Sequence, residues 1–133
     1  MPKTSARKSS VALRARIRIQ RGGEIALGPG KAELLERIRQ TGSIAEAAKG
    51  MGMSYMRAWT LIKTMNRCFK KPLIRAVRGG KQGGGAELTA TGQTALTLYQ
   101  EMEAASLAAA RSDWERMRAL LRPAPPEPTG RKP

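Results

Sequence analysis

The 133-residue sequence contains no histidine, a single cysteine, and only two Trp, two Tyr and one Phe. Without histidine, no Ser/His or Cys/His dyad can form, and the commonest zinc ligand is missing. No paired carboxylates or metal-ligand cluster replace them, so we predict a non-enzyme with no catalytic residue, metal or cofactor. Cys68 cannot form an intrachain disulfide, which is typical of the reducing cytoplasm, and we expect it to be half-buried.

Acidic residues are also missing from a long central stretch. None lies between Glu46 and Glu87, whereas Lys and Arg recur throughout that stretch, and the formal net charge of the chain is +15. Such a field concentrates polyanions, which favours nucleic acid as the partner ahead of an anionic membrane surface. No apolar run approaches the roughly 20 residues that span a bilayer. We therefore expect a cytoplasmic protein that binds no membrane.

Composition divides the chain into four segments. Residues 1–14 are rich in Ser, Lys and Arg and predict a disordered basic arm, and residues 123–133 predict a disordered proline-rich tail. We expect a DNA-binding domain over residues 15–91 and a long helix over residues 92–122. Within the domain, the alternation of ARIRIQ over residues 15–20 predicts a short strand with Ile17 and Ile19 on its buried face.

Cap and stop signals predict three helices. Apolar spacing indicates a helix over residues 30–41 that stops at Gly42. Ser43 then caps a short second helix, with Glu46 completing a capping box, and Gly50 and Gly52 end it. Ser54 caps a third helix. Its apolar stripe consists of Ala58, Ile62, Met65 and Phe69.

A short helix, a glycine turn and a capped helix with an acid-free polar face are typical of a helix-turn-helix unit. The third helix is then the recognition helix, where Arg57 could read guanine and Thr60 could contact bases or phosphate. Packing is the more natural role for Trp59, whereas packing and base stacking are equally open for Tyr55. The predicted DNA-binding residues of this helix are Ser54, Tyr55, Met56, Arg57, Thr60, Lys63, Thr64 and Arg67.

Two predicted strands, residues 73–77 and 87–89, flank the glycine-rich stretch RGGKQGGG and suggest a wing against the sugar-phosphate backbone. A P-loop is excluded, because after Gly79 to Gly84 the motif GxxxxGK[ST] requires Lys and then Ser or Thr, where this sequence has Gly85 and Ala86. A KH-type GXXG loop joins two helices, whereas strands flank this one. A flexible hinge is the remaining alternative. The predicted wing residues are Arg78, Gly80, Lys81, Gln82 and Gly83.

The last predicted helix begins with Thr91 as its cap and runs to Leu121. Its apolar residues alternate spacings of three and four, as in a short coiled-coil seam. This seam predicts a homodimer, and the alternative is a helix that folds back onto its own domain. The predicted dimer-interface residues are Leu107, Ala110, Trp114, Met117 and Leu121.

Two of these stretches, GMSYMRAWTLIKTMN and RGGKQGGGAELTATG, together resemble the N-terminal DNA-binding domain of the ModE family of molybdate-responsive transcription regulators. That domain is itself similar to the winged helix-turn-helix of LysR-type regulators. The resemblance covers about residues 25–105 and implies a dimeric regulator of molybdenum uptake or molybdoenzyme genes that binds a palindromic operator on double-stranded DNA. The family's molybdate-binding region is a separate C-terminal β-rich region, whereas this chain stops at Pro133 after a proline-rich tail.

The predicted fold is mainly α with a small β wing: a winged helix-turn-helix followed by a long C-terminal dimerisation helix. The predicted function is sequence-specific transcription regulation without a molybdate-binding domain of its own. Such a protein binds DNA constitutively, takes its signal from a separate sensor protein, or belongs to a longer original chain. The alternative is an architectural, nucleoid-type protein that binds DNA with little sequence preference.

Overall fold

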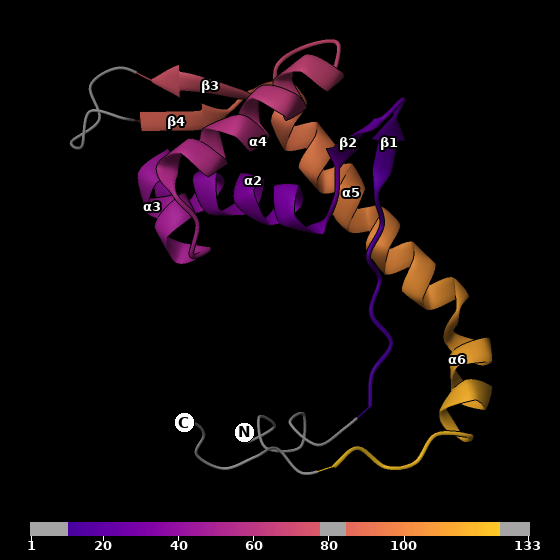
Figure 1. Ribbon diagram of the computed structural model, residues 1–133. Helices are drawn as coiled ribbons and strands as arrows, with labels where there is room; N and C mark the ends of the chain where they lie inside the picture. The colour runs from indigo at the N-terminus through magenta and orange to yellow at the C-terminus, as the bar shows by residue number, and fades with distance from the viewer. Residues whose placement is uncertain (1–10, 78–84, 126–133) are drawn as a thin grey trace. The chain divides into compact units, whose positions relative to one another are not determined.

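The computed structural model describes residues 11–77 and 85–125 and divides the chain into two compact units (Figure 1). Of the described residues, the larger unit contains those from Arg16 to Glu103, and the smaller one combines residues 11–15 with residues 104–125. Mainly helical structure with short strands is present, as the sequence predicts.

Three helices form the centre of the larger unit: α2 (Pro29–Thr41), α3 (Ile44–Gly50) and α4 (Tyr55–Cys68). Their predicted caps are confirmed. Gly42 ends α2 with a φ of 70°, and the Ser43 and Ser54 hydroxyls accept from backbone N–H groups three residues later, at 3.0 Å each. Gly52 has a φ of 68° in the turn before α4, a conformation that glycine adopts without strain.

The core lies where these helices meet. On α4 the predicted stripe is confirmed for Ala58, Ile62 and Met65, which are all buried. Phe69 is only half-buried, because α4 ends one residue before it. The other buried core residues come from both sides of α4 in sequence and include Leu27, Leu34, Leu35, Ile38, Ile44, Ala47, Leu73, Leu96 and Tyr99.

The N-terminal strand is shorter than predicted and has a partner that the sequence interpretation missed. β1 is Ile19–Arg21, not residues 15–20, and it pairs antiparallel with β2 (Glu24–Leu27). Gly22 and Gly23 separate the strands, and Gly22 has a φ of 60°. A two-residue glycine turn of this kind is a hairpin signal, so strand length here is set by pairing rather than by apolar alternation alone.

The second hairpin consists of β3 (Ile74–Val77) and β4 (Gly85–Leu88), each shifted slightly from its predicted bounds. It is fastened to the helices at both strands. The Ala86 N–H donates to the Gly42 carbonyl at 3.1 Å, and the Asn66 side chain receives the Leu73 and Ile74 N–H groups. The predicted wing residues Arg78, Gly80, Lys81, Gln82 and Gly83 lie outside the described residues.

The prediction of one long helix from Thr91 to Leu121 was wrong. The chain forms α5 (Ala90–Ala109) and α6 (Arg111–Arg118), separated by Ala110 at φ −88° and ψ 0°, values typical of the bridge region of backbone conformation. The cap is also two residues earlier than predicted, because the Thr89 hydroxyl, not that of Thr91, accepts from the Gly92 N–H at 3.0 Å. Among the described residues, no helix is both long and apolar enough to cross a membrane.

Gly92 provides a test of how α5 packs. A Cβ at this position would lie 2.1 Å from the Leu73 carbonyl oxygen, whereas a Cβ at Gly30 on α2 meets nothing within 4 Å. We expect Gly92→Ala to lower the free energy of unfolding by about 1–3 kcal/mol, because a backbone atom cannot turn aside. Gly30→Ala should leave it unchanged or raise it by up to about 1 kcal/mol. Urea unfolding followed by circular dichroism measures both, and equal midpoints for the two variants contradict the packing.

Candidate nucleic-acid interface

Helix α4 brings the predicted recognition residues together on its solvent side. Ser54 caps the helix, Tyr55, Met56, Arg57, Thr60, Lys63 and Arg67 are exposed, and Thr64 is half-buried. The opposite side carries Ala58, Ile62 and Met65 into the core. Burial of one face therefore fixes which side chains of α4 are available to a partner.

Aromatic contact orders the first turn of α4. Trp59 packs against the core, and its ring meets the ring of Tyr55 edge to face, with centroids 6.4 Å apart and an interplanar angle of 76°. Tyr55 is 43% exposed. The packing role predicted for Trp59 agrees with this geometry, and Tyr55 borders the exposed face.

Two threonine hydroxyls on the exposed face are turned back onto their own helix. The Thr60 hydroxyl donates to the Met56 carbonyl at 3.1 Å, and the Thr64 hydroxyl donates to the Thr60 carbonyl, also at 3.1 Å. The hydroxyl donor of each threonine is therefore already used in a hydrogen bond within α4. What remains for an external group is the γ-methyl and the acceptor lone pairs.

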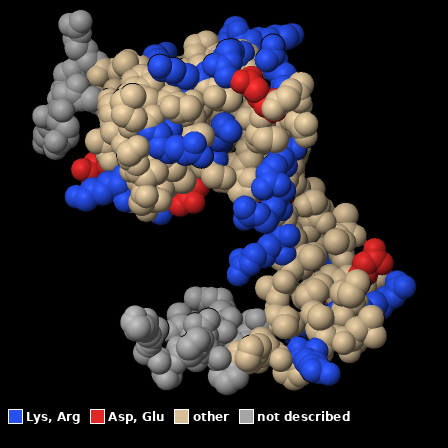
Figure 2. All heavy atoms as spheres, in the orientation of Figure 1, with Lys and Arg blue, Asp and Glu red and all other residues tan. Residues whose placement is uncertain are grey.

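The cations of α4 differ in their partners. Lysine and arginine side chains spread over the visible face of the larger unit, with few acids between them (Figure 2). Arg57 and Lys63 form no ion pair among residues 11–77 and 85–125, so their charges are available. Arg67, by contrast, pairs with Glu24 of β2. Arg67 is one of the residues of α4 predicted to contact phosphate, and its positive charge is already partly neutralised by Glu24.

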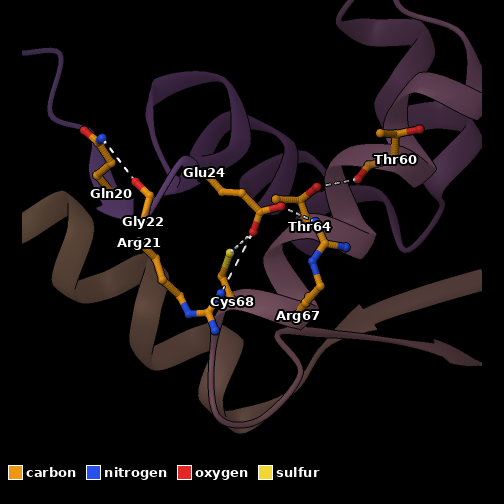
Figure 3. A network of polar contacts seen from close by, with 8 residues as sticks. All are labelled: Gln20, Arg21, Gly22, Glu24, Thr60, Thr64, Arg67 and Cys68. Atoms are coloured by element: carbon orange, nitrogen blue, oxygen red, sulfur yellow. Dashed lines mark hydrogen bonds and ion pairs between the residues drawn. The ribbon is translucent and has the colours of Figure 1, made fainter.

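Glu24 is the centre of a small polar network (Figure 3). Its carboxylate accepts from Arg67 and from the Cys68 thiol, at 3.3 Å for the latter, and Arg21 lies 4.0 Å away. The hydrogen bond from Arg67, followed by that from Cys68, lowers the pKa of Glu24. Cys68 is half-buried as predicted, and its thiol has a polar partner.

Sequence reasoning missed two further residues that shape this region. Lys31 of α2 is half-buried and lies close enough to Arg57 to feel its charge, and burial is the main cause that lowers its pKa. Asn66 joins α4 to the wing: its carbonyl oxygen accepts from the Leu73 and Ile74 N–H groups, and its amide donates to the Ile74 carbonyl. No local pattern identified Asn66, because the backbone groups that it contacts lie seven and eight residues later, beyond the end of α4.

The predicted dimer residues all lie in the smaller unit: Leu107 near the end of α5, Ala110 between the helices, Trp114 and Met117 on α6, and Leu121 after it. Leu107, Met117 and Leu121 are exposed, and Ala110 and Trp114 are half-buried. Leu107 and Trp114 line an open groove of about 750 Å³, together with Val11 and Leu13. The interruption at Ala110 means that the five residues do not follow one regular helix.

Comparison with known proteins agrees with this geometry. Residues 30–93, which include α2, α3, α4 and both wing strands, match the family of bacterial regulatory helix-turn-helix proteins of the lysR type. Over 78 residues the chain is 44% identical to the molybdenum transport protein ModE of Azotobacter vinelandii, covering 59% of this chain and 29% of that protein. The chain carries a ModE-like helix-turn-helix domain.

Two other relatives extend the comparison of the ModE-like domain. The molybdenum-pterin-binding protein MopA of Rhodobacter capsulatus is 39% identical over 91 residues, covering 68% of this chain and 34% of MopA. The DNA-binding transcriptional dual regulator ModE of Escherichia coli strain K12 is 44% identical over 71 residues, covering 53% of this chain and 27% of its own length. The chain thus spans about a third of the length of the curated relatives it matches.

The network around Glu24 gives a pH-dependent prediction. A carboxyl whose folded-state pKa is lowered stabilises the fold above its ordinary value of 4.5, and this stabilisation is lost as the pH falls through the lowered folded value. We expect the wild type to resist urea better than Glu24→Gln at neutral pH, and the difference to shrink towards zero at acid pH. In an Arg67→Ala background the same substitution should have less effect. A difference that is independent of pH contradicts the network.

Proposed function

We propose that this protein is a sequence-specific, DNA-binding transcription regulator that acts on genes of molybdenum uptake or of molybdoenzymes. The exposed face of α4 is the observation that carries the proposal. It combines a capped N-terminus, two cations without an ion-pair partner in residues 11–77 and 85–125 (Arg57 and Lys63), and hydrogen-bonding side chains on a helix whose other face is buried. A helix with such an exposed face fits the major groove of B-DNA, which is about 12 Å wide.

Within this proposal, Arg57 reads a base edge and Lys63 contacts phosphate. Arg57 is near the N-terminus of α4, the part of a recognition helix that meets base edges. Lys63 lies two turns further along, where the helix leaves the groove. The glycine-rich segment with Arg78 and Lys81 and the basic N-terminal arm supply further phosphate contacts, in keeping with the net charge of +15.

The proposal includes a homodimer on a palindromic operator. Exposed apolar side chains at Leu107, Met117 and Leu121 support self-association, since burying them removes apolar surface from water. A two-fold axis would set two copies of α4 on successive major grooves about 34 Å apart. The link to molybdenum rests on the names of the relatives alone.

Selection of binding sites from a random duplex pool at physiological salt, with and without molybdate, tests the function. We expect an inverted repeat to be enriched. If the bound fraction has no sequence preference, the protein is instead an architectural DNA-binding protein, for which phosphate neutralisation alone provides the affinity. A change with molybdate would indicate an oxyanion site in this chain, and equal enrichment would indicate that any signal comes from elsewhere.

Arg57 and Lys63 provide matched variants on the same helix. Arg57→Ala should lower affinity for the selected site by about 1–3 kcal/mol while affecting scrambled DNA much less, because a base contact is lost. Lys63→Ala should weaken both duplexes alike and reduce the slope of log affinity against log salt by about one unit. Fluorescence anisotropy over a salt series measures both effects. If Arg57→Ala lowers affinity for the selected and the scrambled duplex equally, Arg57 does not read a base.

Met117 and Leu120 test the dimer. Met117 is 55% exposed and belongs to the predicted seam, whereas Leu120 is 81% exposed and does not. We expect Met117→Asp to raise the dimer dissociation constant at least tenfold, since a carboxylate would be buried without a partner, roughly 1.4 kcal/mol or more. Leu120→Asp should leave it unchanged. Sedimentation equilibrium gives both constants, and an unaffected Met117→Asp dimer refutes the seam.

A further inference from the structure

The exposed face of α4 has an apolar centre that its charges do not explain. Met56 is 71% exposed although it is a large apolar residue in the first turn of the helix. The fold does not need it there, because Ala58, Ile62 and Met65 form the buried stripe of α4. Exposed apolar surface at a candidate binding site is available for contact with a partner.

Thr60 continues this apolar patch. It follows Met56 by four residues, so both side chains lie on the same side of the helix. The Thr60 hydroxyl donates to the Met56 carbonyl, which leaves no donor for a base and makes its γ-methyl an available contact group. Tyr55, held edge to face against Trp59, borders the patch.

The charges around this apolar patch indicate whether its partner is nucleic acid or protein. Arg57 directly follows Met56, Lys63 lies one turn beyond Thr60, and neither has an ion-pair partner in the described part of the chain. An apolar patch between unpaired cations suits a polyanion that also presents apolar groups. In the major groove of DNA, the apolar group at a base edge is the C5-methyl of thymine.

We infer that Met56 and the γ-methyl of Thr60 read thymine methyl groups in the major groove, so that they determine specificity beside Arg57. This inference rests on the proposed function and deepens it. The flexible thioether of Met56 adapts to a methyl group on either strand, and the shorter Thr60 contacts one held close to the helix axis. The class of sequence bound is then one with at least one thymine in each half-site opposite the first two turns of α4.

The test replaces single thymines of the selected site by deoxyuridine, which removes only the C5-methyl and keeps Watson–Crick pairing. At one or two positions in each half-site we expect affinity to fall roughly threefold to tenfold, the effect of one buried methyl group. For one of these positions, Met56→Ala should bind the duplex with thymine and the duplex with uracil with nearly equal affinity. Lys63→Ala is the control, because it should weaken binding to both and keep their ratio.

The outcomes separate the inference from the function. If an inverted repeat is enriched but no uracil substitution lowers affinity, or if Met56→Ala keeps the wild-type ratio at every position, the inference is wrong while sequence-specific binding stands. If no sequence is enriched, both are wrong. Thermal unfolding of Met56→Ala should match the wild type, since the side chain is exposed, so a lost ratio reports contact with the base.

Discussion

Close contact between three helices fixes the direction in which α4 presents its exposed face, and alanine makes that contact possible. Ala47, Ala48 and Ala58 are all at most 2% exposed where α3 and α4 meet the core. A larger side chain at any of them would have to push the helices apart, because protein cores contain little free volume. Gly52, in the left-handed conformation, lets the chain reverse within this short distance.

The wing hairpin depends on the same framework through backbone contacts. Thr89 joins Leu73 by a backbone hydrogen bond of 2.9 Å, and Asn66 holds the start of β3 against the end of α4. Gly92 then allows α5 to lie directly on the Leu73 carbonyl. Since these contacts involve main-chain atoms on at least one side, the hairpin and α4 are positioned together rather than as separate pieces.

Local signals in the sequence predicted the central helices well, whereas contacts between residues far apart in the sequence were not predicted. Ser43 and Ser54 act within three residues of their partners, so their caps are readable from the sequence. The pair formed by Glu24 and Arg67 joins residues 43 positions apart, and no local pattern encodes it. Strand β2 was missed because a strand is defined by its partner, although the two glycines before it marked a turn.

The interruption between α5 and α6 was equally invisible. Ala110 lies within a run of alanines, the residue with the highest helix propensity, so every local rule predicted continuation. The predicted seam extended the spacing of apolar residues across Ala110 and so assumed a single straight helix. Of the seam residues before and after Ala110, Leu107, Met117 and Leu121 are exposed and Trp114 is half-buried. Whether they share one face remains a proposal, because two helices rather than one carry this stretch of the chain.

Glu24 affects how positive charge is distributed along α4 in a protein whose net charge is +15. A uniformly cationic face would favour phosphate binding at any sequence, because counterion release is indifferent to the bases. Glu24 offsets the charge of Arg67 at the far end of α4, while Arg57, near the helix N-terminus and beside the apolar Met56, has no ion-pair partner among the residues that the structure describes. In the proposed complex, Arg57 and Met56 thus lie in the first turn of α4, the part of a recognition helix that meets base edges. If the proposed function holds, this asymmetry along α4 would let the protein distinguish sequences while its net charge provides a general attraction for DNA.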